Sequence, residues 1–169
     1  MRTRIVVPVA AVSAAVAVFG AGALASGQPA SSAHSAKQGG LENRALFAVL
    51  TGRKEVDADG NRGVGDPDGR GSFAATFDGN ELCFGITVKN IDMPGAAHIH
   101  RGRPNVAGPI VVPLVHPTSG DPGASSDCVT VAEDLSRAIL KRPHKYYVNV
   151  HTAAFGGGAV RGQLFRKSR

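Results

Sequence analysis

Two histidines two positions apart, His98 and His100, are the residues of this chain best placed to do chemistry. They lie in a short apolar run with the β-branched Ile99 between them, which is typical of a β-strand. Because side chains alternate between the two faces of a strand, both imidazoles point to one face and Ile99 to the other. Neutral imidazole is a common ligand for late transition metals, so this pair is a candidate metal clamp.

A third histidine, His151, ends a second strand-like run of residues 146–151. By the same alternation it shares a face with Tyr147 and Asn149, while the residues between them face the other way. If the two strands are neighbours, three imidazoles converge on the outer face of a sheet whose opposite face is core. The pattern predicts a three-histidine site with open coordination, suited to one Cu or Zn ion.

A structural interpretation of the same histidines stays open beside the metal site. The three imidazoles could form a hydrogen-bonded cluster that ties the two strands to the loop of residues 102–108. Asn149, Tyr147 and Arg101 would supply partners, and Arg161 could satisfy carbonyl groups of the loop. We therefore expect these four residues to surround the histidines in either case.

The N-terminal segment has the pattern of an export signal. Arg2 and Arg4 precede an apolar run over residues 5–24, which ends in the small-x-small sequence Ala23-Leu24-Ala25. A membrane anchor is the alternative, since a span requires about 20 apolar residues, but the small residues and the polar stretch that follows favour cleavage. We predict a signal peptide over residues 1–25 and, from its Ser/Ala/Gly/Gln-rich composition, a disordered leader over residues 26–40.

Residues 41–169 are the right length for one compact domain. The chain carries 19 Lys and Arg against 13 Asp and Glu, a net charge of +6 that falls to +4 without Arg2 and Arg4. The basic residues are scattered apart from the tail at residues 166–169, without interleaved aromatics, which argues against nucleic-acid binding. A modest positive charge on an exported protein favours anionic cell-wall polymers, so the expected partner is an unidentified protein or the cell wall.

The domain is predicted to be all-β with one short helix. Apolar alternation and turn residues predict strands at residues 44–51, 72–77, 82–89, 109–115, 128–131, 146–152 and 159–165, besides the strand of His98 and His100. The helix is expected at residues 134–140, capped by Asp134 and stopped by Pro143. Short strands separated by Gly/Pro turns predict a Greek-key β-sandwich of the immunoglobulin-like kind.

The loop after the first strand contains Asp57-Ala58-Asp59-Gly60 and Asp66-Pro67-Asp68-Gly69. Alternating carboxylates at this spacing could bind Ca²⁺. The segment lacks the bidentate glutamate and the spacing of an EF-hand, however, and Asp, Gly and Pro clusters are typical of turns. We prefer the interpretation as turns.

Cys83 and Cys128 are the two cysteines of the chain. In an exported protein such a pair predicts one disulfide, which would close a loop of about 45 residues and stabilise the fold by roughly 4 kcal/mol. The alternative, in which one thiol joins the metal site, is less favoured because neither cysteine lies in the histidine strands.

Several segments together resemble the CHRD domain, the module named after chordin. They are Leu50-Thr51-Gly52 with Glu55-Val56, Gly65-Asp66-Pro67-Asp68-Gly69, Ala97-His98-Ile99-His100-Arg101-Gly102, Gly108-Pro109-Ile110-Val111-Val112, Tyr147-Val148-Asn149-Val150-His151-Thr152 and Gly158-Ala159-Val160-Arg161-Gly162-Gln163-Leu164. The resemblance covers nearly all of residues 41–169. It implies an exported or extracellular β-sandwich whose biochemical role is mostly unassigned. In chordin the copies belong to a secreted antagonist of growth factors, a role that a single copy is not expected to inherit.

A fainter resemblance is to Cu/Zn superoxide dismutase, which is also a Greek-key sandwich. In that family a His-x-His strand and a later Val-His supply three copper ligands, and His98, His100 and His151 fall in the matching order. Residues 156–161 loosely resemble the loop that carries the guiding arginine of that enzyme. The resemblance implies a superoxide dismutase-like fold and, as an alternative function, a mononuclear copper redox enzyme.

One ligand of that family is missing here. Ala107-Gly108-Pro109-Ile110 resembles the segment that bridges copper and zinc, with Ile110 where the bridging histidine would stand. His116 is a candidate fourth ligand, although it lies in a different loop. Because the bridging histidine also relays a proton in that enzyme, its loss favours a non-enzymatic binding or structural module, and we assign no catalytic residue.

Overall fold

The computed structural model describes residues 45–166. The expected signal peptide at residues 1–25 and the leader at residues 26–40 lie outside the described residues. Within residues 45–166, no helix has the length and apolar character that crossing a membrane requires.

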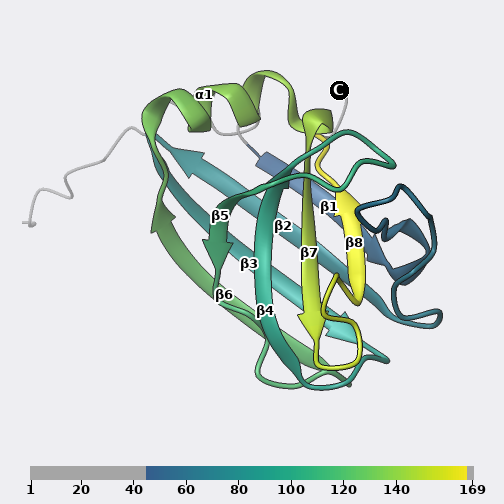
Figure 1. Cartoon of the computed structure of the whole chain (residues 1–169). Helices are drawn as coiled ribbons and strands as arrows, with labels where there is room; N and C mark the ends of the chain where they lie inside the picture. Colours follow the sequence, from purple (N-terminus) through teal and green to yellow (C-terminus); the bar gives the residue numbers. More distant parts are fainter. Residues whose placement is uncertain (1–44, 167–169) are drawn as a thin grey trace, which may run out of the picture. The chain divides into compact units, whose positions relative to one another are not determined.

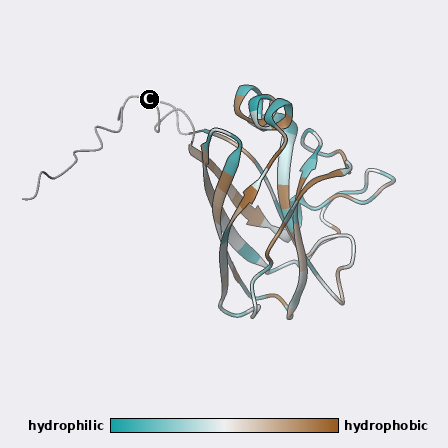
Figure 2. Ribbon diagram, turned by 90° about the vertical axis from the view of Figure 1, so that its left-hand side faces the viewer, coloured by the Kyte–Doolittle hydropathy of each residue, from teal (hydrophilic) through white to brown (hydrophobic). Residues whose placement is uncertain are grey.

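The described chain forms eight β-strands and one α-helix (Figure 1). The strands are β1 (Ala45–Thr51), β2 (Arg70–Asp78), β3 (Glu81–Lys89), β4 (Pro94–Arg101), β5 (Ile110–Leu114), β6 (Gly123–Thr130), β7 (Tyr146–Thr152) and β8 (Val160–Gln163). Helix α1 (Glu133–Lys141) lies across one end of the sheet (Figures 1 and 2). Two short 3₁₀ helices, η1 (Gly52–Lys54) and η2 (Pro143–Lys145), follow β1 and precede β7.

All strand pairs are antiparallel, and the strands follow the order β5-β4-β7-β8-β1-β2-β3-β6. Two four-stranded halves meet where β1 pairs with β8 through Thr51 and Arg161. The chain crosses between the halves after β3, after β5 and after β6, and β6 lies beside β3, a connection of the Greek-key type. The all-β fold with one short helix is confirmed.

Alternating apolar residues form the core between the two halves. On β3 the residues Leu82, Phe84, Ile86 and Val88 are all buried, as their period of two predicts. In the other half the core receives the residues of β4 and β7 that alternate with the histidines, namely Ala97, Ile99, Val148 and Val150. Burial of one large apolar side chain such as that of Ile99 contributes about 1.5–3 kcal/mol. The apolar residues therefore determine which face of β4 and which face of β7 point to the core. The histidines are thereby directed outward.

Strand β6 is longer than the strand predicted at residues 128–131. Strand β6 also includes residues 123–127, which were expected to be part of a loop. It pairs with β3 along its whole length, from Val88↔Gly123 to Glu81↔Thr130. The strand is at the edge of the sheet, and most of its side chains are exposed. An edge strand of small polar residues has no apolar alternation, so the sequence pattern could not reveal it.

Helix α1 begins one residue earlier than predicted, and its N-cap is Ala132. The prediction that Asp134 caps the helix is therefore wrong. Asp134 instead lies in the first turn, where a carboxylate still interacts favourably with the helix dipole. The predicted apolar face is confirmed, since Ile139 is fully buried and Leu135 packs against the core.

The aspartates of the loop after β1 form turns. The Asp57 carboxylate accepts hydrogen bonds from the backbone N–H groups of Asp59 (3.0 Å) and Asn61 (2.8 Å) and from the Asn61 side-chain amide (2.8 Å). The bond from the Asn61 side chain is the largest cause of the lowered pKa of Asp57. In the second cluster, Asp66 accepts from the N–H of Gly69 at 3.2 Å. These contacts support the interpretation as turns.

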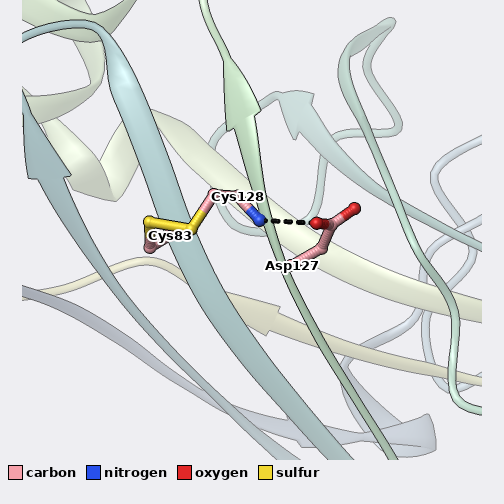
Figure 3. Close-up of a disulfide and its surroundings, with 3 residues drawn as sticks. All are labelled: Cys83, Asp127 and Cys128. Carbon is pink, nitrogen blue, oxygen red and sulfur yellow. Dashed lines mark hydrogen bonds between the residues drawn. A yellow bond between two sulfur atoms is a disulfide. The ribbon is translucent and has the colours of Figure 1, made fainter.

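The predicted disulfide joins Cys83 and Cys128 (Figure 3). The two residues are direct cross-strand partners on β3 and β6, with Cα atoms 4.0 Å apart. The backbone N–H of Cys128 also donates to the Asp127 carboxylate at 2.8 Å (Figure 3). The bond therefore links the edge strand covalently to its one neighbour in the sheet.

We expect the double variant Cys83→Ser/Cys128→Ser to be less stable to urea than the parent by about 4 kcal/mol, because the disulfide restricts the unfolded chain over 45 residues. The free energy of unfolding should be measured with and without reductant. Reductant should lower the stability of the parent to that of the variant and leave the variant unchanged. Equal stability of parent and variant under oxidising conditions would contradict a stabilising role.

Candidate functional site

The three histidines meet on the outer face of β4 and β7. These strands are antiparallel neighbours, and their register places His98 opposite Asn149 and His100 opposite Tyr147. His151 is opposite Ala96 and diagonal to His98, so it shares their face. One nitrogen of each imidazole lies within 4.8 Å of the others. The predicted convergence of His98, His100 and His151, the three-histidine cluster, is therefore present.

The size of the cluster suits one metal ion. Three points within 4.8 Å of one another lie at most about 2.8 Å from a shared centre. Because Zn–N bonds are about 2.0–2.1 Å long, each nitrogen would move inward by less than about 1 Å to bind. Side-chain rotations supply movements of that size without a change in strand pairing.

His100 presents a free lone pair. Its Nδ1 lies 2.8 Å from the carbonyl oxygen of Gly108, and since a carbonyl only accepts, this nitrogen carries the proton. In the neutral ring the other nitrogen, Nε2, is then an acceptor. It is buried and has no hydrogen-bond partner among the described residues. Metal-binding histidines typically donate their second nitrogen to a carbonyl or carboxylate in this way.

Both ring nitrogens of His151 have polar neighbours. Its Nδ1 lies 3.0 Å from the Gly156 carbonyl oxygen, and its Nε2 lies 3.2 Å from Nδ1 of His98 and 3.0 Å from Oδ1 of Asn149. Because both oxygens only accept, the neutral ring donates to one of them; with the proton on Nδ1, Nε2 is an acceptor, which Asn149 can meet only through its amide nitrogen. A proton on His98 Nδ1 can bridge the two rings, and a metal ion would take the place of that proton.

Burial keeps the imidazoles of His98 and His100 neutral. It is the main cause that lowers the pKa of His98 to about 4, with smaller effects of His151 and His100. The pKa of His100 is also lowered, again mainly by burial. Both rings are therefore in the unprotonated form that binds metal ions at neutral pH.

Tyr147 and Arg161 support the cluster from beside it. The Tyr147 ring stacks on the His100 ring, with centroids 4.8 Å apart and planes within 9° of parallel. Tyr147 is on β7, between β4 and β8, and the Arg161 guanidinium of β8 lies 3.4 Å from the centre of its ring. This cation–π contact is buried, which strengthens it. The result is a continuous stack from His100 through Tyr147 to Arg161.

Arg161 also fixes the loop that orients His100. Its Nη2 donates to the carbonyls of Arg103 (3.1 Å) and Val106 (2.9 Å), as expected for an arginine that satisfies loop carbonyls. At the end of this loop the Gly108 N–H donates to the Tyr147 hydroxyl at 3.1 Å. A Cβ atom on Gly108 would lie 1.8 Å from the Arg101 carbonyl oxygen, so only glycine fits there.

Glu55 also belongs to the site, which its position in the sequence did not predict. It is 1% exposed, and its Oε1 lies 3.9 Å from Nη1 of Arg161. Burial raises its pKa to about 7, with opposing effects of the Val56 N–H, Arg161 and Asn149. Its motif Glu55-Val56 contributed to the family resemblance, but a lone glutamate next to a turn carries no spacing signal for a buried carboxylate.

Other candidate residues lie apart from the cluster. Arg101 is exposed, and within residues 45–166 no side-chain hydrogen bond or ion pair joins it to the histidines. His116 is outside the cluster, with its Nδ1 at 2.9 Å from the Pro117 carbonyl oxygen. Ile110 is 53% exposed on the edge strand β5.

The variant Glu55→Gln tests the buried carboxyl. A folded-state pKa near 7, above the usual 4.5, stabilises the parent below pH 4.5, and this contribution is lost as the pH rises through 7. Because the glutamine cannot ionise, the free energy of unfolding of the variant relative to that of the parent should rise between pH 5 and pH 8 by on the order of 2 kcal/mol. Urea unfolding at both pH values measures the difference.

Asp57→Asn is the matched control, because Asp57 has a lowered pKa and remains ionised from pH 5 to pH 8. Its stability relative to the parent should be the same at both pH values. A Glu55→Gln difference that is equally flat would contradict a raised pKa of Glu55.

Comparison with known proteins identifies the family of the chain. No curated protein and no solved structure matches it. The sequence model of the CHRD domain matches residues 46–164, which include every strand but the first residue of β1, together with all three histidines. The chain belongs to the CHRD domain family.

Proposed function

We propose that this protein is an exported CHRD-domain binding module that holds one Cu or Zn ion through His98, His100 and His151. The observation that carries the proposal is the buried Nε2 of His100, which has no hydrogen-bond partner among the described residues. A buried acceptor without a partner costs about 1–3 kcal/mol, and a metal ion at the centre of the cluster would remove this cost. The opposite nitrogen of the same ring is already fixed by Gly108.

The donor set favours a late transition metal. Three neutral imidazoles suit Cu(II) and Zn(II), and the order of divalent affinities places Cu(II) above Zn(II). No carboxylate joins the histidines in the cluster found among residues 45–166, which disfavours Ca²⁺ or Mg²⁺. A three-histidine site leaves a coordination position open for water or for a group on a partner.

Export fits two features of the chain. The Cys83–Cys128 disulfide is of the kind that persists in oxidising compartments, and the family resemblance points outside the cell. We propose secretion, with association to the cell wall through the positive net charge. In this role the metal ion would stabilise the outer face of the sheet or bridge to a partner.

Calorimetric titration of the purified protein with Cu(II) and with Zn(II) tests the metal site. The parent should bind one ion, and His100→Ala should bind at least 100-fold more weakly because a ligand is lost. His116→Ala is the matched control, since this histidine is outside the cluster, and it should bind as the parent does. If neither ion binds the parent, or if both variants bind equally well, the site is refuted.

A superoxide dismutation assay of the copper-loaded protein distinguishes a binding module from a redox enzyme. The open coordination position supports superoxide turnover, whereas Ile110 in place of a bridging histidine disfavours it. We expect metal uptake without superoxide dismutation above that of free buffer, measured by a standard competition assay. Turnover that is abolished by His100→Ala and retained by His116→Ala would instead identify the enzyme.

A further inference from the structure

A cavity apart from the three histidines lies beside β8. It is a cavity of about 510 Å³ between the end of β1, the loops after β1 and β4, η2 and β8. Figure 1 shows the loop after β1 and the loop after β4 next to β8. Pockets that hold small ligands commonly have volumes of about 300–1,000 Å³, so the cavity is large enough for a small organic molecule.

The charged side chains that line this cavity are all positive. The cationic side chains of Lys54, Arg62 and Arg161 line it, and no carboxylate does so among the described residues. Neither Lys54 nor Arg62 forms an ion pair within residues 45–166. The Lys54 ammonium donates to the Val49 carbonyl at 2.9 Å, which leaves two of its protons for a ligand. The cavity is therefore suited to an anion.

The same cavity has an apolar wall. Val49 is 54% exposed and Phe165 is 45% exposed, and both line it. The Phe165 ring packs at 6.0 Å from the Phe47 ring, so it is held in place. A purely inorganic anion would leave this wall in water, whereas an anion with an apolar body would cover it.

A buried cation in the wall of the cavity is a second reason to expect a negatively charged ligand. Arg161 is 2% exposed, and its Nη1 has no hydrogen-bond partner among the described residues. The nearest carboxylate oxygen, Oε1 of Glu55, is 3.9 Å away. Because the pKa of Glu55 is raised to about 7, its charge only partly balances that of Arg161 at neutral pH. The positive charges of Lys54, Arg62 and Arg161 therefore exceed the negative charge of Glu55 beside them.

We propose that this cavity binds a small amphipathic organic anion, with its charged head at Lys54 and Arg62 and its apolar body against Val49 and Phe165. The proposal does not depend on the metal site. A singly charged carboxylate with a chain of about eight carbons matches both the charge and the apolar wall, so octanoate is the probe.

Calorimetric titration with octanoate, acetate and octan-1-ol tests the proposal. We expect octanoate to bind one site at least tenfold more tightly than acetate, which lacks the chain, or octan-1-ol, which lacks the charge. The double variant Lys54→Gln/Arg62→Gln should bind octanoate at least tenfold more weakly. Lys89→Gln/Lys141→Gln removes the same charge from exposed positions outside the cavity and should bind as the parent does.

Three results would overturn the proposal: no binding of octanoate at millimolar concentration, equal binding of octan-1-ol, or an equal loss in both double variants. Urea unfolding checks that each variant is folded. His100→Ala should retain octanoate binding, so that failure of the metal site and failure of this site are measured separately.

Discussion

The arrangement of residues on the outer face of the sheet depends on the contacts of one buried group, the guanidinium of Arg161. A charge away from water requires partners, and Arg161 has the carbonyls of Arg103 and Val106, the ring of Tyr147 and the carboxyl of Glu55. These contacts hold the loop after β4 against the sheet. The same loop ends at Gly108, whose carbonyl fixes the tautomer of His100. The histidine cluster is thus oriented by a charge two strands away.

Strand β7 is buried on both faces, for two different reasons. Its inner residues join the apolar core, whereas Tyr147 and Asn149 on its outer face are covered although they are polar or amphipathic. Asn149 is 1% exposed and contacts His151, and Glu55 from the loop after β1 lies close to it. A ligand set that projects from paired strands is held more rigidly than one on a loop, and this favours a preformed metal site.

The parity of His98, His100 and His151 was predictable because apolar residues alternate with them and can face only the core. The same rule predicted most of β3, whereas the pairing of Cys83 with Cys128 was predicted from the presence of two cysteines in an exported protein. It could not predict the first part of β6, where Ala124, Ser125 and Ser126 lie at an exposed edge without an apolar face. It also could not place Glu55, since the burial of that residue comes from a loop folding onto β8 rather than from any local pattern.

Function in this chain is a property of the site and not of the sandwich that carries it. A CHRD domain with the same strands but another residue at position 100 would lose the buried acceptor and keep the core, because His100 and the core residue Ile99 are on opposite faces. Arg161 and Glu55 are different, since they hold the loops whether or not a metal is present. Substitution at the histidines is therefore expected to change metal affinity with a small effect on folding. Substitution at Arg161 would disturb the loops, the histidines and the neighbouring cavity together.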